Sequence, residues 1–258
     1  AHKDFLASHD AMVGNIPDER DRWERRHNFY LNCIRDVDRN IHALLEELDA
    51  SGLADRTIVI LTADHGDMDG AHQLHAKGAV AYREQNNVPL YIVHPALSGG
   101  KTVDAVTTHV DLAPTLVAFT GAEASKQAQI TRGLPGKDLS AVLKAPEHAG
   151  LDAVREGALF NYNMFAYVDG PFLQKAADFI NAGNDPKKLK DSGIKPDLMK
   201  RGAVRSVYDG RYVYARYFSP KQHNRPETLE EIRAYNDVEL YDTQTDPYEM
   251  DNLASRNP

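Results

Sequence analysis

The sequence predicts an α/β fold in which part of a mostly parallel sheet is flanked by helices. A smaller α+β region with an antiparallel hairpin follows. Three observations support this prediction. A long amphipathic pattern covers residues 21–50, two short apolar runs cover residues 57–62 and 88–93, and Asp209-Gly210 separates two runs of strand-forming residues. Short apolar runs bounded by turn residues are typical of buried strands in an open α/β sheet.

Apolar residues in the first segment recur three or four positions apart, which is the spacing of one helix face. This stripe consists of Tyr30, Ile34, Val37, Ile41, Leu44, Leu45 and Leu48. Gly52 follows, and glycine is favoured just past a helix end. Pro114 suits the first turn of a later helix, and Asp111 is a candidate for capping it. Asp-Gly favours a type I′ turn, so we expect a two-residue hairpin at Asp209-Gly210.

Composition sets limits on partners and on covalent structure. The chain has 258 residues and a formal net charge of −8, which disfavours general binding to nucleic acid or to an anionic membrane. No apolar run approaches the ~18 residues of a membrane span. The single cysteine excludes an intrachain disulfide and leaves the compartment open among periplasmic, secreted and cytoplasmic. We expect a division into an α/β part, residues 1–150, and a smaller α+β part, residues 151–258.

Polar side chains gather directly after the first apolar run. Asp64 and His65 follow the carboxyl end of the expected strand, where ligands bind in open α/β sheets. A carboxylate suits Ca²⁺, Mg²⁺ or Mn²⁺, and an imidazole can complete a metal shell. Lys77 supplies the compact positive charge that a bound sulfate or phosphate requires. The pattern therefore indicates a metal-assisted oxyanion-ester site, with an ordinary polar loop as the alternative.

Several stretches, taken in order, resemble the C-terminal half of a sulfatase of the alkaline phosphatase superfamily. Residues 30–66 look like the family's long helix running into its metal-binding strand end. The segment GAHQLHAKG is similar to the family's G-E-H-x-L-W-G-K-G, and ELYDTQTDPYEMDNLA is close to its ELYD-x-x-x-DP-x-E-x-x-NLA ending. The resemblance spans most of residues 30–254 and implies an arylsulfatase-like, alkaline-phosphatase-like fold.

The resemblance assigns roles to four residues. Asp64 matches the family's metal-binding aspartate, and His65 takes the position of the next metal ligand. The resemblance implies that the bound ion is Ca²⁺, with Mn²⁺ or Mg²⁺ as alternatives. Lys77 matches the lysine that contacts the sulfuryl oxygens, and His72 matches a histidine that lines the pocket. The chain departs from the family pattern at Ala71, His75 and Ala76, and these departures affect the expected substrate class more than the fold.

The family's nucleophile is a formylglycine made from Cys or Ser in a C/S-x-P/A-x-R motif of the N-terminal half. Cys33 is followed by Ile34-Arg35 and does not match this motif. We therefore expect the chain to begin inside a longer protein, to need the N-terminal half of that protein, and to be inactive alone. The expected substrate is a small sulfate ester. The alternatives are a phosphonate monoester or phosphodiester hydrolase of the same superfamily, and a non-catalytic sulfatase-like binding fragment.

Overall fold

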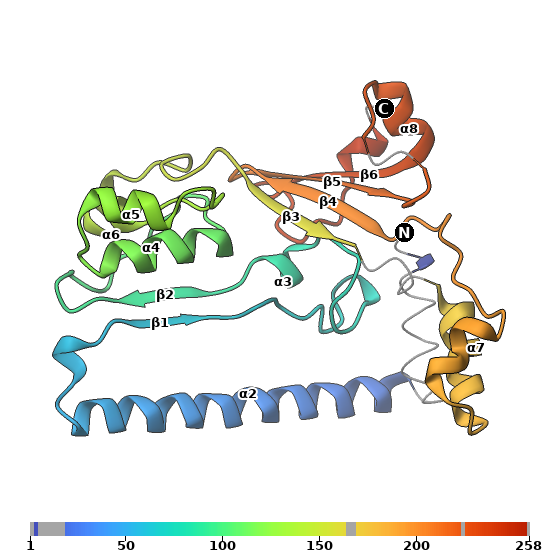
Figure 1. Cartoon of the computed structure of the whole chain (residues 1–258), viewed down its shortest axis with the longest axis horizontal. Helices are drawn as coiled ribbons and strands as arrows, with labels where there is room; N and C mark the ends of the chain where they lie inside the picture. Colours follow the sequence, from blue (N-terminus) through green and yellow to red (C-terminus); the bar gives the residue numbers. More distant parts are fainter. Residues whose placement is uncertain (1–2, 5–18, 164–168, 223–224, 257–258) are drawn as a thin grey trace.

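A long helix runs beside a two-stranded sheet, and a four-stranded sheet lies on the other side of these strands (Figure 1). The computed structural model describes residues 3–4, 19–163, 169–222 and 225–256. Helix α2 covers Glu19–Ala50, as expected from the apolar periodicity. Within the described residues, no helix is both long and apolar enough to cross a membrane.

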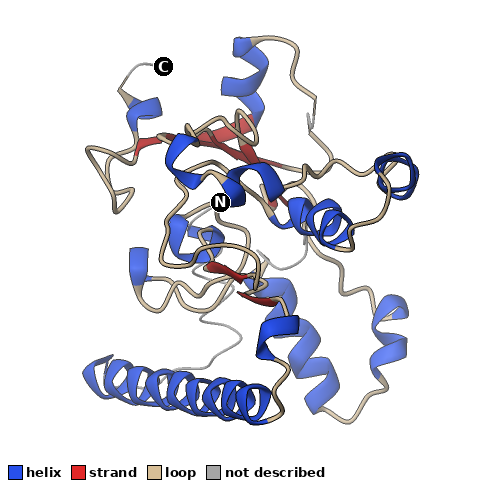
Figure 2. Ribbon diagram, turned by 90° about the vertical axis from the view of Figure 1, so that its left-hand side faces the viewer, coloured by secondary structure: helices blue, strands red, loops and turns tan. Residues whose placement is uncertain are grey.

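The apolar stripe of α2 lies mostly at the surface. Ile34 is 48% exposed and Leu44 is 70% exposed, and both belong to the stripe. Figures 1 and 2 show the helix extending along one side of the molecule. Near its N-terminal end, Arg26 and Trp23 contact the loop after β1. Most of the face that the sequence marks as core-facing is therefore uncovered by the described residues.

The two apolar runs form strands β1 (Val59–Thr62) and β2 (Leu90–Val93). They pair antiparallel, with Ile60 opposite Ile92. The chain leaves β1, forms the polar loop and short helix α3 (Arg83–Asn86), and returns in the opposite direction. Each strand pair among the described residues is antiparallel, which differs from the mostly parallel sheet that we expected. An antiparallel return needs no crossover along the sheet.

Short helices follow β2. They are α4 (Leu112–Phe119), α5 (Ala124–Ile130) and α6 (Ser140–Lys144), and they lie together at one end of β2 (Figure 1). Pro114 lies in the first turn of α4, as predicted. Asp111 precedes α4, but its side chain makes no cap hydrogen bond to that helix. It instead completes a capping box with Thr108 on the preceding 3₁₀ turn, His109–Asp111, so the predicted cap of α4 is wrong.

The C-terminal region contains the four-stranded antiparallel sheet β3-β4-β5-β6. The strands are β3 (Ala158–Tyr162), β4 (Ala203–Tyr208), β5 (Tyr212–Phe218) and β6 (Asn236–Asp242), with helices α7 (Gly170–Asn181) and α8 (Leu229–Tyr235) inserted between them. The expected hairpin joins β4 to β5. The predicted boundary near residue 150 stays a prediction.

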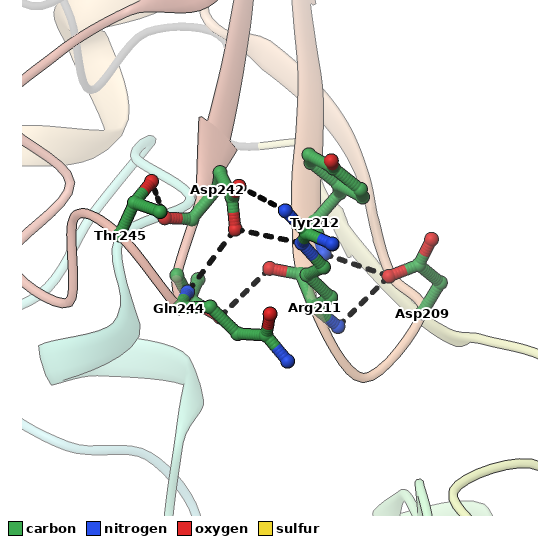
Figure 3. Close-up of polar contacts among 7 residues, drawn as sticks. Asp209, Arg211, Tyr212, Asp242, Gln244 and Thr245 are labelled. Carbon is green, nitrogen blue, oxygen red and sulfur yellow. Dashed lines mark hydrogen bonds and ion pairs between the residues drawn. The ribbon is translucent and has the colours of Figure 1, made fainter.

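The hairpin turn differs from the predicted one by one position. The amide of Asp209 donates to the carbonyl of Tyr212 at 3.2 Å, so Gly210 and Arg211 are the central residues. Gly210 has a φ of +100°, and Arg211 is not among the described residues with positive φ. Glycine at the first central position fits a type II′ turn. The Asp209 carboxylate fixes this arrangement because it accepts from the amides of Arg211 and Tyr212 (Figure 3).

A buried apolar cluster joins the loop after β1 to the C-terminal sheet. The loop contributes Met68, Leu74 and the segment from Ala79 to Tyr82, and the sheet contributes Val204, Ala215, Tyr217 and Tyr241. The hydroxyl of Tyr217 also accepts from the amide of Ala81 at 3.1 Å. The loop that carries the candidate site is therefore packed against sheet residues that are far away in the sequence.

Candidate functional site

The candidate site begins two residues after β1. The Asp64 carboxylate is 85% exposed. Its Oδ1 accepts from the amide of His65 at 3.0 Å. This short contact fixes the orientation of the carboxylate, and Oδ2 lies 3.3 Å from Nε2 of the His65 ring. An exposed, fixed carboxylate oxygen beside an imidazole nitrogen is an arrangement that can bind a cation.

His65 connects Asp64 to Lys77. Its Nδ1 lies 2.8 Å from the carbonyl of Gly66, which can only accept, so Nδ1 carries the ring proton. The lone pair of Nε2 then accepts from the Lys77 ammonium at 2.5 Å. Three of the four residues singled out in the sequence therefore converge at one point. The Lys77 ammonium and the Asp64 carboxylate both lie beside Nε2 of His65, so a positive charge is already close to the candidate cation position.

The loop around this point is fixed by one buried amide side chain. Gln85 is 3% exposed; its Oε1 accepts from the amide of Gly78 at 2.6 Å and its Nε2 donates to the carbonyl of Val80. The backbone carbonyl of Gln85 accepts from the amide of Gly66 at 2.8 Å. The segments just after His65 and just after Lys77 are thus both bonded to one residue, which holds the two side chains together.

The start of α2 supports the same loop from the other side. Arg26 donates to Asp67 at 2.9 Å. The ring of Trp23 lies 4.4 Å from the ring of His75, measured between centroids, and a β-carbon on Gly70 would meet the Trp23 ring at 2.8 Å. His75 is buried at the position where the family pattern has Trp, so this departure is filled by an aromatic contact with α2.

His72, the fourth residue, lies in a different environment. Its ring stacks on Tyr82 with centroids 3.7 Å apart and planes at 9°. It lies close to Glu84 and Glu249, and the ligand atoms of these three side chains are all within 4.8 Å of one another. Burial lowers the pKa of His72. In the described part of the chain, no hydrogen bond, ion pair or ring contact joins His72 to Asp64, His65 or Lys77, so its pocket-lining role stays a prediction.

Sequence reasoning did not single out Glu249 as a site residue. It is 1% exposed and its Oε2 accepts from the amide of Arg83 at 2.9 Å. Burial raises the pKa of Glu249 to about 7. The tail motif contains this glutamate, but no spacing in the sequence connects it with a histidine so far upstream.

Comparison with known proteins shows which family this chain is similar to. Residues 3–122 match the Sulfatase family. Over 230 residues the chain is 28% identical to an N-acetylglucosamine-6-O-sulfatase of Bacteroides thetaiotaomicron, covering 87% of this chain and 31% of that protein. The chain is sulfatase-like. It spans less than a third of the length of that curated relative.

Solved structures show the fold of this sulfatase-like chain. A protein of Bacteroides fragilis named as a sulfatase, yidJ, superposes with a TM-score of 0.63 at 22% identity, covering 95% of this chain and 42% of the other. A phosphonate monoester hydrolase of Agrobacterium radiobacter gives a TM-score of 0.58 at 22% identity, covering 87% and 36%. The expected alkaline-phosphatase-like α/β class with a C-terminal antiparallel hairpin is confirmed.

Proposed function

We propose that the complete protein hydrolyses sulfuric esters and that this chain supplies the metal-binding and anion-binding side of the active site. The observation that supports the proposal best is the convergence of Asp64, His65 and Lys77 just after β1. Asp64 Oδ2 and His65 Nε2 would hold a divalent cation, for which Ca²⁺ is the first candidate and Mn²⁺ and Mg²⁺ are the alternatives. Such a cation acts as a Lewis acid toward ester oxygens.

Lys77 would move from His65 Nε2 to the sulfuryl oxygens when a cation and substrate bind. Its ammonium is a compact charge on a flexible stem, so the displacement requires only side-chain rotation. Stabilisation of negative charge that builds on the ester oxygens is the main contribution expected from such a residue. A histidine would protonate the leaving group, and the resemblance places His72 only along the lining of the pocket. The formylglycine nucleophile would come from outside these residues, since Cys33 lies exposed on α2 without the required motif.

The test compares rates on matched esters with the complete protein. We expect a higher kcat/KM for an aryl sulfate than for the corresponding aryl phosphonate monoester, and loss of both after chelation with recovery on adding Ca²⁺. N-acetylglucosamine 6-sulfate is the first carbohydrate to assay, since one relative is named for it. Asp64→Asn should abolish the recovery by metal, because it removes the carboxylate charge and leaves the side-chain volume unchanged.

Two other outcomes would each favour an alternative function. A higher kcat/KM for the phosphonate ester would favour the phosphonate monoester or phosphodiester alternative, which the fold likeness to a phosphonate monoester hydrolase also allows. Absence of turnover on every ester, with saturable binding of a sulfate ester retained, would favour the non-catalytic binding alternative.

A further inference from the structure

His72, Glu84 and Glu249 come from three separate segments and meet in one place. His72 lies on the loop after β1, Glu84 on α3 and Glu249 on the tail after β6. One ligand atom from each lies within 4.8 Å of the others. A cation about 2 Å from each atom would bring these atoms to roughly 3.3 Å from one another, so the cluster would have to contract when the ion binds.

Both carboxylates have an oxygen without a hydrogen-bond partner. Within the residues that the structure describes, Glu84 Oε2 and Glu249 Oε1 are buried and unpartnered. Glu249 directs its other oxygen, Oε2, at the amide of Arg83, which leaves Oε1 for the cluster. A buried polar atom without a partner costs free energy, and each such atom in a native protein requires an explanation.

The Arg83 side chain acts on Glu249 only at a distance and forms no ion pair with either carboxylate. The guanidinium of Arg83 is the nearest candidate along the chain, but its side chain donates to the carbonyl of Pro247 at 2.7 Å. No ion pair to Glu84 or Glu249 occurs in the described ranges. Two carboxylates that share a buried site repel each other unless a proton or a cation lies between them.

His72 has the properties of a metal ligand. Burial lowers its pKa, which favours the neutral imidazole that metals bind. Its ring is fixed by stacking on Tyr82 and by a hydrogen bond to the backbone of Tyr248. Metal-binding histidines usually donate their second ring nitrogen to a carbonyl or a carboxylate in this way.

We propose that His72, Glu84 and Glu249 bind one divalent transition-metal ion of the Zn²⁺ class, and that this ion fastens the C-terminal tail to the loop that carries Lys77. Zn²⁺ binds both histidine nitrogen and carboxylate oxygen in proteins, and this cluster offers one imidazole and two carboxylates. The site is separate from the donor pair Asp64 and His65, and it does not require that pair to bind metal.

The experiment uses the complete protein, stripped of metal by a chelator and titrated with Zn²⁺ alone. Calorimetry gives the stoichiometry, and thermal unfolding gives the change in Tm. We expect Glu249→Gln to remove one equivalent of Zn²⁺, or to weaken its binding by about tenfold or more, and to abolish the matching rise in Tm. Glutamine retains an oxygen that can accept from the Arg83 amide, so the tail contact is preserved.

Controls separate this site from other sites. Glu147→Gln is the matched variant, since Glu147 lies exposed beside His148 at 3.6 Å. Glu84→Gln provides a second variant should Glu249→Gln fail to fold. Asp64→Asn reports on the proposed active site alone, so the two proposals can fail independently. Equal Zn²⁺ stoichiometry and equal Tm shifts in Glu249→Gln, Glu84→Gln and Glu147→Gln would overturn the inference, and so would the absence of Zn²⁺ binding to the parent protein.

Discussion

Gly66 lies directly against the backbone of Glu84. A β-carbon added to Gly66 would stand 1.8 Å from the Glu84 carbonyl oxygen, far inside van der Waals contact. The amide of Gly66 also donates to the carbonyl of Gln85. The glycine that follows Asp64-His65 is therefore required by the close approach of two chain segments. It couples the end of β1 to helix α3 through backbone atoms, and displacing these atoms would cost free energy of folding.

Gly66→Ala should be strongly destabilising, because the clash is with backbone rather than with a flexible side chain. We expect a loss of about 2–3 kcal/mol in the free energy of unfolding, as for an overpacked core. Urea denaturation measures the change. Gly99→Ala is the matched control, since a β-carbon at Gly99 would meet nothing within 4 Å. Equal stability of the two variants would show that the segments separate without cost.

Lys77→Ala should lower kcat/KM on an aryl sulfate by about 10²–10³-fold, the usual cost of removing one preorganised donor from a developing anion. The free energy of unfolding should change little, because Lys77 is exposed and its ammonium bonds to the ring of His65, which is also near the surface. Steady-state kinetics and urea denaturation give the two values. Lys101→Ala, at another exposed lysine, should have no effect on either. Unchanged kinetics in Lys77→Ala would mean that the lysine is only a surface charge.

Asp111 forms the most completely bonded buried carboxylate near the site. It is 0% exposed and accepts from the amides of Lys137 at 2.7 Å and Thr108 at 2.9 Å. The Arg155 guanidinium contacts both of its oxygens. Arg155 side-chain exposure is 13%, so removing the aspartate would leave a charge uncompensated in the interior.

Asp111→Ala should therefore lower the free energy of unfolding by about 3–5 kcal/mol. Replacing both partners, with Asp111→Ala and Arg155→Met together, should recover part of this loss because no unpaired charge remains. A double-mutant cycle from urea denaturation tests the coupling. Additive effects of the two single changes would show that the pair contributes nothing beyond its separate hydrogen bonds.

The Arg211–Asp242 ion pair should make the stability of the C-terminal sheet depend on pH in the acid range. Arg211 donates two hydrogen bonds to Asp242, at 3.0 Å and 2.6 Å (Figure 3). These hydrogen bonds hold the pKa of Asp242 below its ordinary value. Folding therefore favours the charged carboxylate. Its contribution to stability is complete above the unfolded pKa of about 3.9 and is lost as the pH falls through the lower folded value.

Asp242→Asn should consequently be less stable than the parent protein at neutral pH, and the difference should narrow as the pH falls below about 3.9. Urea denaturation of both proteins at several pH values gives the difference directly. Asp152→Asn, at an exposed aspartate, serves as the control and should show a pH-independent difference near zero. A constant gap for Asp242→Asn across the range would contradict the linkage.

Local patterns predicted the elements that bear on the site. The periodic stripe of α2, the apolar runs of β1 and β2, and the hairpin between β4 and β5 all lie where the sequence places them. Asp64 and His65 follow β1 as expected because a strand end and a polar loop are encoded by adjacent residues. His65 and Lys77 lie on the same loop after β1, so their contact joins two residues that are close in the sequence.

Side-chain contacts that no local pattern encodes explain what the sequence did not reveal. The environment of His72 depends on Glu249, which reaches it through the tail after β6. The position of the hairpin turn depends on the Asp209 carboxylate, which caps the following amides and shifts the turn centre to Gly210 and Arg211. Asp111 matches a helix cap in sequence, but Arg155 from a distant segment takes its carboxylate. Distant partners decided the cases of His72 and Asp111, whereas contacts between near neighbours decided the position of the turn.

The single tryptophan of the chain lies where it is most useful to an experimenter. Trp23 contacts the ring of His75 and faces Gly70, on the loop that leads to Lys77. An indole next to a histidine changes its emission when the loop moves or when the imidazole gains a proton. The protein therefore carries an intrinsic fluorophore in contact with its candidate active-site loop, and loop ordering by metal or by a sulfate ester can be followed without any label.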